Sequence, residues 1–168
     1  RHLAQQVVEQ KHSVLSGNLS SLDAVIIESA CSAAEELDKD AKEIVVSYLP
    51  AGQECARNLG EIRDSSNNDW DKRSGPPRPI PEPIGQADVL ILVGGYDGTH
   101  TAAAWARDAD TPVLPVATFG MAAREILSYE EQTSPLKRIV RLTDDDRQRL
   151  KKSASALDDE DKIREYAK

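Results

Sequence analysis

The residues best suited to bind a ligand lie in a glycine-rich turn. Gly94 and Gly95 follow the apolar run at 87–93, and Gly98 and Thr99 precede an alanine-rich segment. N–H groups at the start of a helix have no partner within it, and the helix dipole makes that end positive. Glycine lets such a backbone approach a ligand closely. The pattern predicts a cradle for a phosphate or carboxylate.

Two further turns have the same character. They are SGNLSS at 16–21 and ATFGMAA at 117–123, and each contains glycine and precedes an expected helix. In open α/β sheets, ligands bind beyond the carboxyl ends of the strands, so we expect the three turns to meet. Neither the Walker spacing nor G-x-G-x-x-G is present, which argues against the usual triphosphatase and dinucleotide-binding sites.

The segments that must position these turns alternate between strand and helix. This alternation is typical of α/β domains, and we predict a Rossmann-like, doubly wound, mostly parallel sheet with helices on both faces. The polar, proline-rich segment 64–83 is expected to be a loop. The expected strands are 12–16, 43–49, 87–93, 111–118 and 136–142, and the expected helices are 1–11, 20–37, 53–63, 99–108, 120–131 and 143–167.

Composition narrows the function classes. A chain of 168 residues with 39% hydrophobic residues is long enough for one soluble domain with a core. The net charge of −8 disfavours nucleic-acid binding, which needs a basic face. Cys31 and Cys55 are far apart and lack C-x-x-C spacing, so we expect no cysteine zinc site and no disulfide. The apolar runs are too short to span a membrane, and the cytoplasm is the expected compartment.

Several side chains in these turns suit a nucleotide, and each has a plainer interpretation. Asp97 accepts a bond from a ribose hydroxyl or stabilises its own turn. Thr99 is expected to cap the following helix, and His100 faces either the ligand or solvent. Phe119 stacks on an adenine or fills the core. An acidic protein that binds an anion also needs a local cation, and Arg57 is one option.

The predicted ligand-binding set combines the three turns with that arginine. Ser20 and Asn18 either donate to a phosphate or serve the cap of the helix at 20–37. No His/Asp/Glu cluster indicates a metal site. The full set is Gly17, Asn18, Ser20, Arg57, Gly94, Gly95, Asp97, Gly98, Thr99, His100, Phe119 and Gly120.

Two stretches carry a resemblance to a known superfamily. The stretch ADVLILVGGYDGTHTAAAWARDADTPVLPVATFGMAARE at 87–125 resembles the glycine-rich core of the SLOG superfamily, the Rossmann-like domains related to LOG and Smf/DprA proteins. VLSGNLSSLDAVIIESA at 14–30 resembles the earlier turn and helix of that superfamily. The resemblance implies a SLOG-like domain at 1–142, with a strand before residue 1, and a charged helical segment at 143–168.

The resemblance also implies a function. It is strongest to the branch joined to sirtuin-like or TIR domains in Thoeris-type anti-phage defence. There the domain senses a cyclic ADP-ribose isomer and controls an effector that consumes NAD. Enzymes of the LOG type have a catalytic glutamate three residues after the motif threonine, and this chain has Ala102 there. A sensor is therefore expected rather than an enzyme.

These features leave three functions open. The first is a sensor of an ADP-ribose-type nucleotide that forms homo-oligomers and acts on a fused or partner effector, or through a membrane segment elsewhere. The second is a nucleotide N-glycosidase that uses Asp23, Asp97 or Glu125. The third is an assembly domain without a ligand. No catalytic residue and no cofactor other than the nucleotide ligand is expected.

Overall fold

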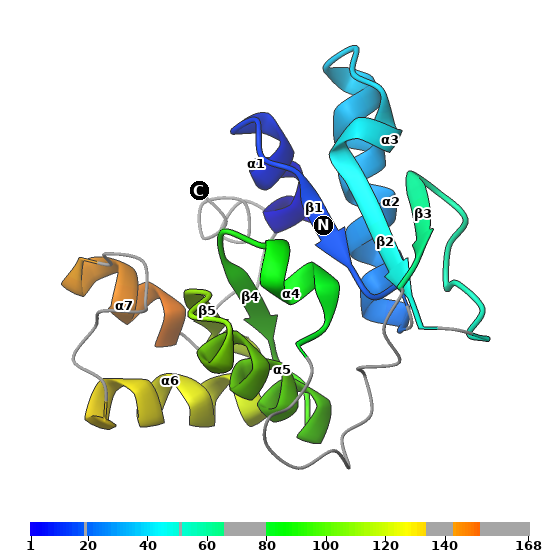
Figure 1. Ribbon diagram of the computed structural model, residues 1–168. Coiled ribbons are helices and arrows are strands. Elements are labelled where there is room, and N and C mark those ends of the chain that lie inside the picture. Colours follow the sequence, from blue (N-terminus) through cyan, green and yellow to red (C-terminus); the bar gives the residue numbers. More distant parts are fainter. Residues whose placement is uncertain (19, 51, 66–79, 134–142, 152–168) are drawn as a thin grey trace. The chain divides into compact units, whose positions relative to one another are not determined.

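The computed structural model describes residues 1–18, 20–50, 52–65, 80–133 and 143–151 (Figure 1). The described residues form two compact units, with the boundary between Asp71 and Lys72. Unit 1 takes in the described residues up to Ser65, and unit 2 those from Ile80 onwards. Parallel strands and helices make up both units, which confirms the predicted α/β class.

Unit 1 is a three-stranded parallel sheet with helices against it. The strand order is β1-β2-β3, and Ser16 of β1 lies opposite Ser47 of β2. The middle strand, β2, is buried along its whole length. The elements are α1 (His2–Glu9), β1 (Val14–Ser16), α2 (Ser21–Glu36), α3 (Ala41–Ile44), β2 (Val45–Leu49) and β3 (Glu61–Asp64).

The core of unit 1 lies between α1, α2 and β2. Small residues of α2, among them Ala30 and Ala34, are fully buried beside Val8 of α1 and Val45 of β2. Small side chains let two helices approach closely, so the apolar stripe of α2 is covered by α1 on one side and by the sheet on the other. The helix predicted at 20–37 is confirmed, and Ser20 is its N-cap.

The helix expected at 53–63 is wrong. The segment is irregular as far as Gly60, and Glu61 then begins β3, which pairs in parallel with β2. Gly60 has a φ of 72°, and a Cβ there would lie 2.5 Å from the carbonyl oxygen of Val45. Glycine therefore lets the chain turn tightly against β2, and pairing with that buried strand replaces helical hydrogen bonds. Residues 41–44 also differ, because they form α3 before β2 begins.

Unit 2 contains a pair of parallel strands and the helices that follow them. β4 and β5 pair with Leu90 opposite Val113, and α5 and α6 pack against each other below them (Figure 1). β4 is only partly buried, with Leu92 its one buried residue. The elements are α4 (Glu82–Gln86), β4 (Leu90–Val93), α5 (Asp97–Asp108), β5 (Val113–Val116), the 3₁₀ turn η1 (Ala117–Phe119), α6 (Met121–Thr133) and α7 (Asp144–Lys151).

Several expectations for unit 2 are changed in detail. The last two residues of the expected loop at 64–83 belong to α4. One of them is Pro83, and the first turn of a helix is a position that accommodates proline. α5 begins two residues before the predicted start. The strand expected at 136–142 lies outside the described residues, and the helix expected at 143–167 is described only as α7. The predicted boundary after residue 142 stays a prediction.

The two cysteines are free within the described chain and differ in accessibility. Cys31 is buried in the unit 1 core, whereas Cys55 is half-buried in the loop before β3. Burial, and to a smaller extent the nearby Glu35 carboxylate, raise the pKa of the Cys31 thiol. No group of metal-ligating side chains and no helix able to span a membrane occurs in the described ranges.

We expect iodoacetamide to alkylate Cys55 quickly in the native protein and Cys31 only after unfolding. The thiolate is the reactive form, and burial both disfavours it and blocks access. Peptide mass spectrometry over a time course measures the two rates separately. In concentrated guanidinium the two cysteines should react at similar rates, which is the control. Equal rates in the native protein would contradict the buried position of Cys31.

Candidate functional site

The turn between β4 and α5 has an unusual backbone. Gly94 and Gly95 are both left-handed, with φ of 59° and 83°. Tyr96 is the N-cap of α5, and its side chain makes no capping hydrogen bond. Two successive left-handed residues are tolerated without strain only by glycine. The glycine pair therefore reverses the chain sharply at the carboxyl end of β4.

The carbonyl groups of this turn hold the start of α6. The N–H of Ala122 donates to the Gly95 carbonyl oxygen at 3.1 Å, and the N–H of Ala123 donates to that of Gly94 at 3.1 Å. In a trans peptide the C=O and N–H point in opposite directions. The N–H groups of Gly95 and Tyr96 are therefore directed away from α6.

The donors at the start of α5 are open. No acceptor for the N–H groups of Gly95, Tyr96, Asp97 or Gly98 is found among the residues that the structure describes. Tyr96 and Asp97 are exposed, so water reaches these groups. Successive N–H donors at the positive end of a helix attract anions. The β4–α5 turn is a site at which an anionic ligand can replace water.

Thr99 has a different role from the cap that we predicted. The N-cap is Tyr96, and the Thr99 N–H donates to the Tyr96 carbonyl oxygen at 2.9 Å. Thr99 lies against the Gly95 backbone, because a Cβ on Gly95 would be 1.8 Å from its Oγ1. The left-handed glycine pair lets the helix begin earlier, so the threonine falls inside the first turn and packs on the glycine.

Asp97 and His100 are exposed in the first turn of α5. The Asp97 carboxylate stabilises the helix start and repels a second anion, whereas it accepts a hydrogen bond from a hydroxyl group. His100 Nε2 lies 3.0 Å from a carboxylate oxygen of Glu125 on α6. The two starting turns of α5 and α6 are thus linked by side chains as well as by backbone.

The turn before α6 presents apolar side chains to solvent. Phe119, at the end of η1, is 55% exposed, so it does not fill the core. Gly120 follows with φ 72° and ψ −148°, a conformation that only glycine adopts readily. Met121 is also left-handed, with φ 57°, and is exposed. Both turns of unit 2 therefore contain two successive residues with positive φ.

The turn at 16–21 in unit 1 is occupied by its own side chains. Ser20 Oγ accepts from the Asp23 N–H at 3.1 Å, and the Asp23 carboxylate accepts from the Ser20 N–H at 2.9 Å. Ser16 Oγ donates to the same carboxylate at 3.2 Å. This reciprocal arrangement is a capping box. The Asp23 carboxylate therefore lies where an anion would bind at α2, and Gly17 is half-buried beside it.

We expect Ser20→Ala to lower the free energy of unfolding by about 1 kcal/mol, because an N-cap and half of a capping box are lost. Urea denaturation followed by circular dichroism measures the change. Ser32→Ala is the matched control, since Ser32 is exposed within the same helix and alanine is the better helix former there. A Ser20 variant as stable as the control would show that the cap contributes nothing.

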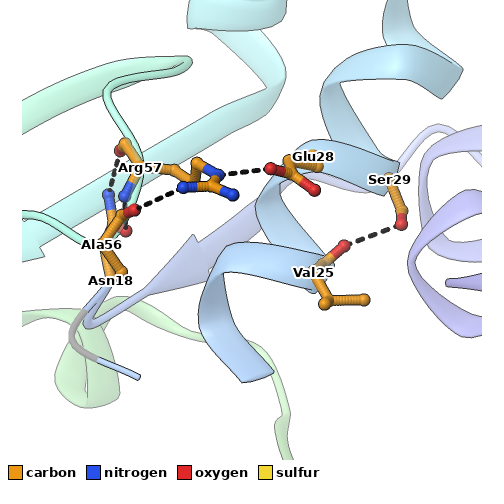
Figure 2. Close-up of polar contacts among 6 residues, drawn as sticks. All are labelled: Asn18, Val25, Glu28, Ser29, Ala56 and Arg57. Carbon is orange, nitrogen blue, oxygen red and sulfur yellow. Dashed lines mark hydrogen bonds and ion pairs between the residues drawn. The ribbon is translucent and has the colours of Figure 1, made fainter. Parts of the chain in front are cut away.

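Asn18 is fully buried and holds the loop before β3 (Figure 2). Its amide nitrogen donates to the Arg57 carbonyl oxygen at 2.6 Å and to Ser47 Oγ at 3.2 Å. Its amide oxygen accepts from the Arg57 N–H at 2.9 Å. The backbone of Asn18 is left-handed, with φ 50°, and its carbonyl oxygen accepts from the Ala56 N–H at 2.8 Å. The Asn18 amide therefore donates to and accepts from the Arg57 backbone, as a neighbouring strand would.

Arg57 is directed towards α2 rather than left free. Its Nε donates to the Glu28 carboxylate, and Nη1 donates to the Ala56 carbonyl oxygen at 3.4 Å (Figure 2). Both side chains are exposed enough for solvent to screen the pair. An anion that bound Arg57 would have to displace Glu28.

Arg63, on β3, is a second cation with partners. It donates to both carboxylate oxygens of Glu61 at 2.8 Å and to the Tyr48 hydroxyl at 3.2 Å, and it lies over the Tyr48 ring. The hydrogen bonds from Arg63 lower the pKa of the Glu61 carboxyl, and those to Glu61 and Tyr48 raise the pKa of Arg63. This cluster anchors an edge of the sheet and stays charged.

Comparison with known proteins gives one finding about the fold. No protein-family model and no curated protein matches the chain. Among solved structures, the X-ray structure of TM1055, a Northeast Structural Genomics Consortium target, matches with a TM-score of 0.55 and 18% identity. The match covers 75% of this chain, which spans 65% of the length of TM1055. At this identity the match shows the fold alone, which is a Rossmann-like α/β fold.

The structure brings together the predicted residues of unit 2. The turns at 94–101 and 117–123 are adjacent, since backbone hydrogen bonds join them. The meeting of these two turns with the turn at 16–21 of unit 1 stays a prediction. Sequence reasoning did not single out Tyr96, whose position directly after the glycine pair was the available signal. It also gave no sign that His100 and Glu125 pair.

Proposed function

We propose that the chain is a ligand-sensing domain of the SLOG superfamily that binds an ADP-ribose-type nucleotide at the β4–α5 turn. One observation carries the proposal: successive backbone donors at the start of α5 have no acceptor among the described residues, at the carboxyl end of a parallel strand. Rossmann-like folds bind nucleotides at that end of the sheet. The fold shared with TM1055 is consistent with the superfamily.

The chemistry of the turn suits a nucleotide better than a simple anion. The N–H groups of Gly95 and Tyr96 suit phosphate oxygens, and the neighbouring Asp97 carboxylate suits a ribose hydroxyl. A bare phosphate would accept from the N–H groups but would be repelled by the Asp97 carboxylate. In unit 1, the Asp23 carboxylate already fills the start of α2, so the unit 2 turn is the stronger candidate for the phosphate.

The proposed output is control of an effector. By its resemblance to the Thoeris-associated branch, the domain would bind a cyclic ADP-ribose isomer and switch on a sirtuin-like or TIR effector that consumes NAD. A ligand that binds one arrangement of units or subunits more tightly shifts the population towards it. Ala102 in place of the glutamate of LOG enzymes supports sensing over turnover.

Calorimetry tests binding directly. The purified chain is titrated with ADP-ribose, cyclic ADP-ribose isomers, NAD and AMP, and chromatography of the same samples measures turnover. Tight binding of a cyclic isomer that is recovered intact is the expected result. Absence of binding by all four ligand types would overturn the proposal and leave an assembly domain. Release of a free base would replace sensing by catalysis.

A second function, N-glycoside hydrolysis, is favoured by the His100–Glu125 pair. The 3.0 Å contact places a carboxylate and a potential proton carrier beside the β4–α5 turn. Glu125 would stabilise positive charge at the ribose carbon while water attacks it and the base leaves with a proton. If free base is released, Glu125→Gln should abolish that release and leave ligand affinity nearly unchanged.

A further inference from the structure

We propose that Tyr96 and Phe119 form a stacking platform for the nucleobase of the ligand. The proposal rests on the proposed function and adds how the base is held. Tyr96 is 75% exposed and Phe119 55% exposed, and Met121, two residues after Phe119, is 40% exposed. Tyr96 and Phe119 together are called the aromatic rim. Aromatic residues make up only 4% of the chain, so two exposed rings at adjacent turns are a local concentration.

The two turns that carry the rim are fixed to each other. The hydrogen bonds from Ala122 and Ala123 to Gly95 and Gly94 tie the turn of Tyr96 to the turn of Phe119. A Cβ on Gly94 would lie 3.7 Å from the Phe119 Cβ, which is van der Waals contact. The Phe119 side chain therefore starts beside Gly94. The rim and the open N–H donors therefore lie on two turns of unit 2 that backbone hydrogen bonds join.

The unusual backbone keeps Phe119 outside the core. Ala117 and Thr118 of η1 are buried, and the chain then turns outward through Gly120 and Met121, both left-handed. A non-glycine residue in this region is uncommon, and such strain clusters at ligand sites. Burial of a phenylalanine would stabilise the fold, yet the turn directs this ring to solvent.

The neighbouring groups select the occupant. Any flat nucleobase can stack on an exposed aromatic ring, because stacking does not depend on the hydrogen-bonding groups of the base. The adjacent Asp97 carboxylate suits a hydroxylated sugar, and the open donors of α5 suit phosphate. A nucleotide is the small molecule that combines a flat base, a sugar and a phosphate. The rim is therefore assigned to the base end of the ligand.

The test compares a ligand with and without its base. ADP-ribose and ribose 5-phosphate are titrated into the wild-type chain and the Phe119→Ala, Phe119→Trp and Tyr96→Ala variants. Loss of a ring should weaken ADP-ribose binding about tenfold and leave ribose 5-phosphate binding unchanged. Phe119→Trp should retain ADP-ribose binding. Tyr129→Ala is the matched control, because Tyr129 is 53% exposed on α6 outside the rim.

The outcomes separate the platform from the site beneath it. If the wild type binds ADP-ribose and the ring variants bind it equally well, the platform is overturned and the proposed function stands. If ring loss weakens both ligands alike, the rings act on the fold of the turn, which also overturns stacking. If the wild type binds neither ligand, the platform for ADP-ribose falls, and the proposed function falls with it only if the cyclic isomers, NAD and AMP also fail to bind. Loss of self-association on sedimentation without loss of binding would assign the rim to a second copy.

Discussion

Replacement of Asn18 by alanine is expected to lower the free energy of unfolding by about 3 kcal/mol or more. The change removes three hydrogen bonds inside the protein and leaves the Arg57 backbone N–H and C=O without the partners they have now. Each of these hydrogen bonds contributes about 1 kcal/mol, and the fully buried Ser47 hydroxyl also loses the amide that donates to it. Alanine is also less tolerant than asparagine of the left-handed conformation at this position.

Urea denaturation measures this effect, and two further variants make it specific. Asn18→Asp keeps one acceptor but removes the amide donor and buries a charge, so it should be at least as destabilising. Asn58→Ala is the matched control, because Asn58 is exposed in the same loop, and its effect should stay within about 0.5 kcal/mol. An Asn18→Ala protein as stable as the control would show that the loop before β3 is held by other contacts.

Replacement of Gly95 by alanine is expected to damage both stability and ligand binding. The added Cβ would lie 1.8 Å from Thr99 Oγ1 and 2.8 Å from Thr99 Cβ, at a φ of 83°. Overpacking and left-handed strain together should cost about 2 to 4 kcal/mol. Relief of the clash requires the turn to move, which displaces the open donors, so ADP-ribose affinity should also fall.

Gly52→Ala separates the two causes. Gly52 has nearly the same φ, 79°, but no atom lies within 4 Å of the position of its Cβ. Its cost should therefore be conformational strain alone, about 1 kcal/mol. Thermal unfolding and calorimetry on both variants give the comparison. Equal destabilisation by the two substitutions would mean that Thr99 moves away from the added Cβ at no cost in free energy. The contact between Gly95 and Thr99 would then not constrain the turn.

Local signals in the sequence predicted much of this fold. Ser20 stands before an apolar stripe and is the cap of α2, because capping depends only on residues within one turn. The glycine pair marked the turn after β4 for the same reason. The fold class followed from the alternation of apolar runs and helical stripes, which are set by burial on one face.

Long-range contacts explain what the sequence did not predict. The loop before β3 is held by the Asn18 amide, which donates to the backbone of Arg57 across 39 residues, and no local pattern encodes such a contact. The early start of α5 depends on the left-handed backbone of Gly94 and Gly95. In the sequence, Thr99 had the residue type of an N-cap and so indicated a later start. The His100–Glu125 pair joins residues 25 positions apart through the packing of α5 on α6.

The peptide units after Gly94 and Gly95 have consequences for how this turn can change during evolution. Their carbonyl groups hold α6, and their N–H groups face the proposed ligand. Selection for folding alone would therefore preserve both glycines in a descendant that had lost its ligand. Retention of the glycine pair in a related sequence would therefore indicate a conserved fold and would not by itself indicate ligand binding. The side chains around it, Tyr96, Asp97 and Phe119, are free to drift once binding ceases, and they are the positions at which a lineage would reveal loss of the signal.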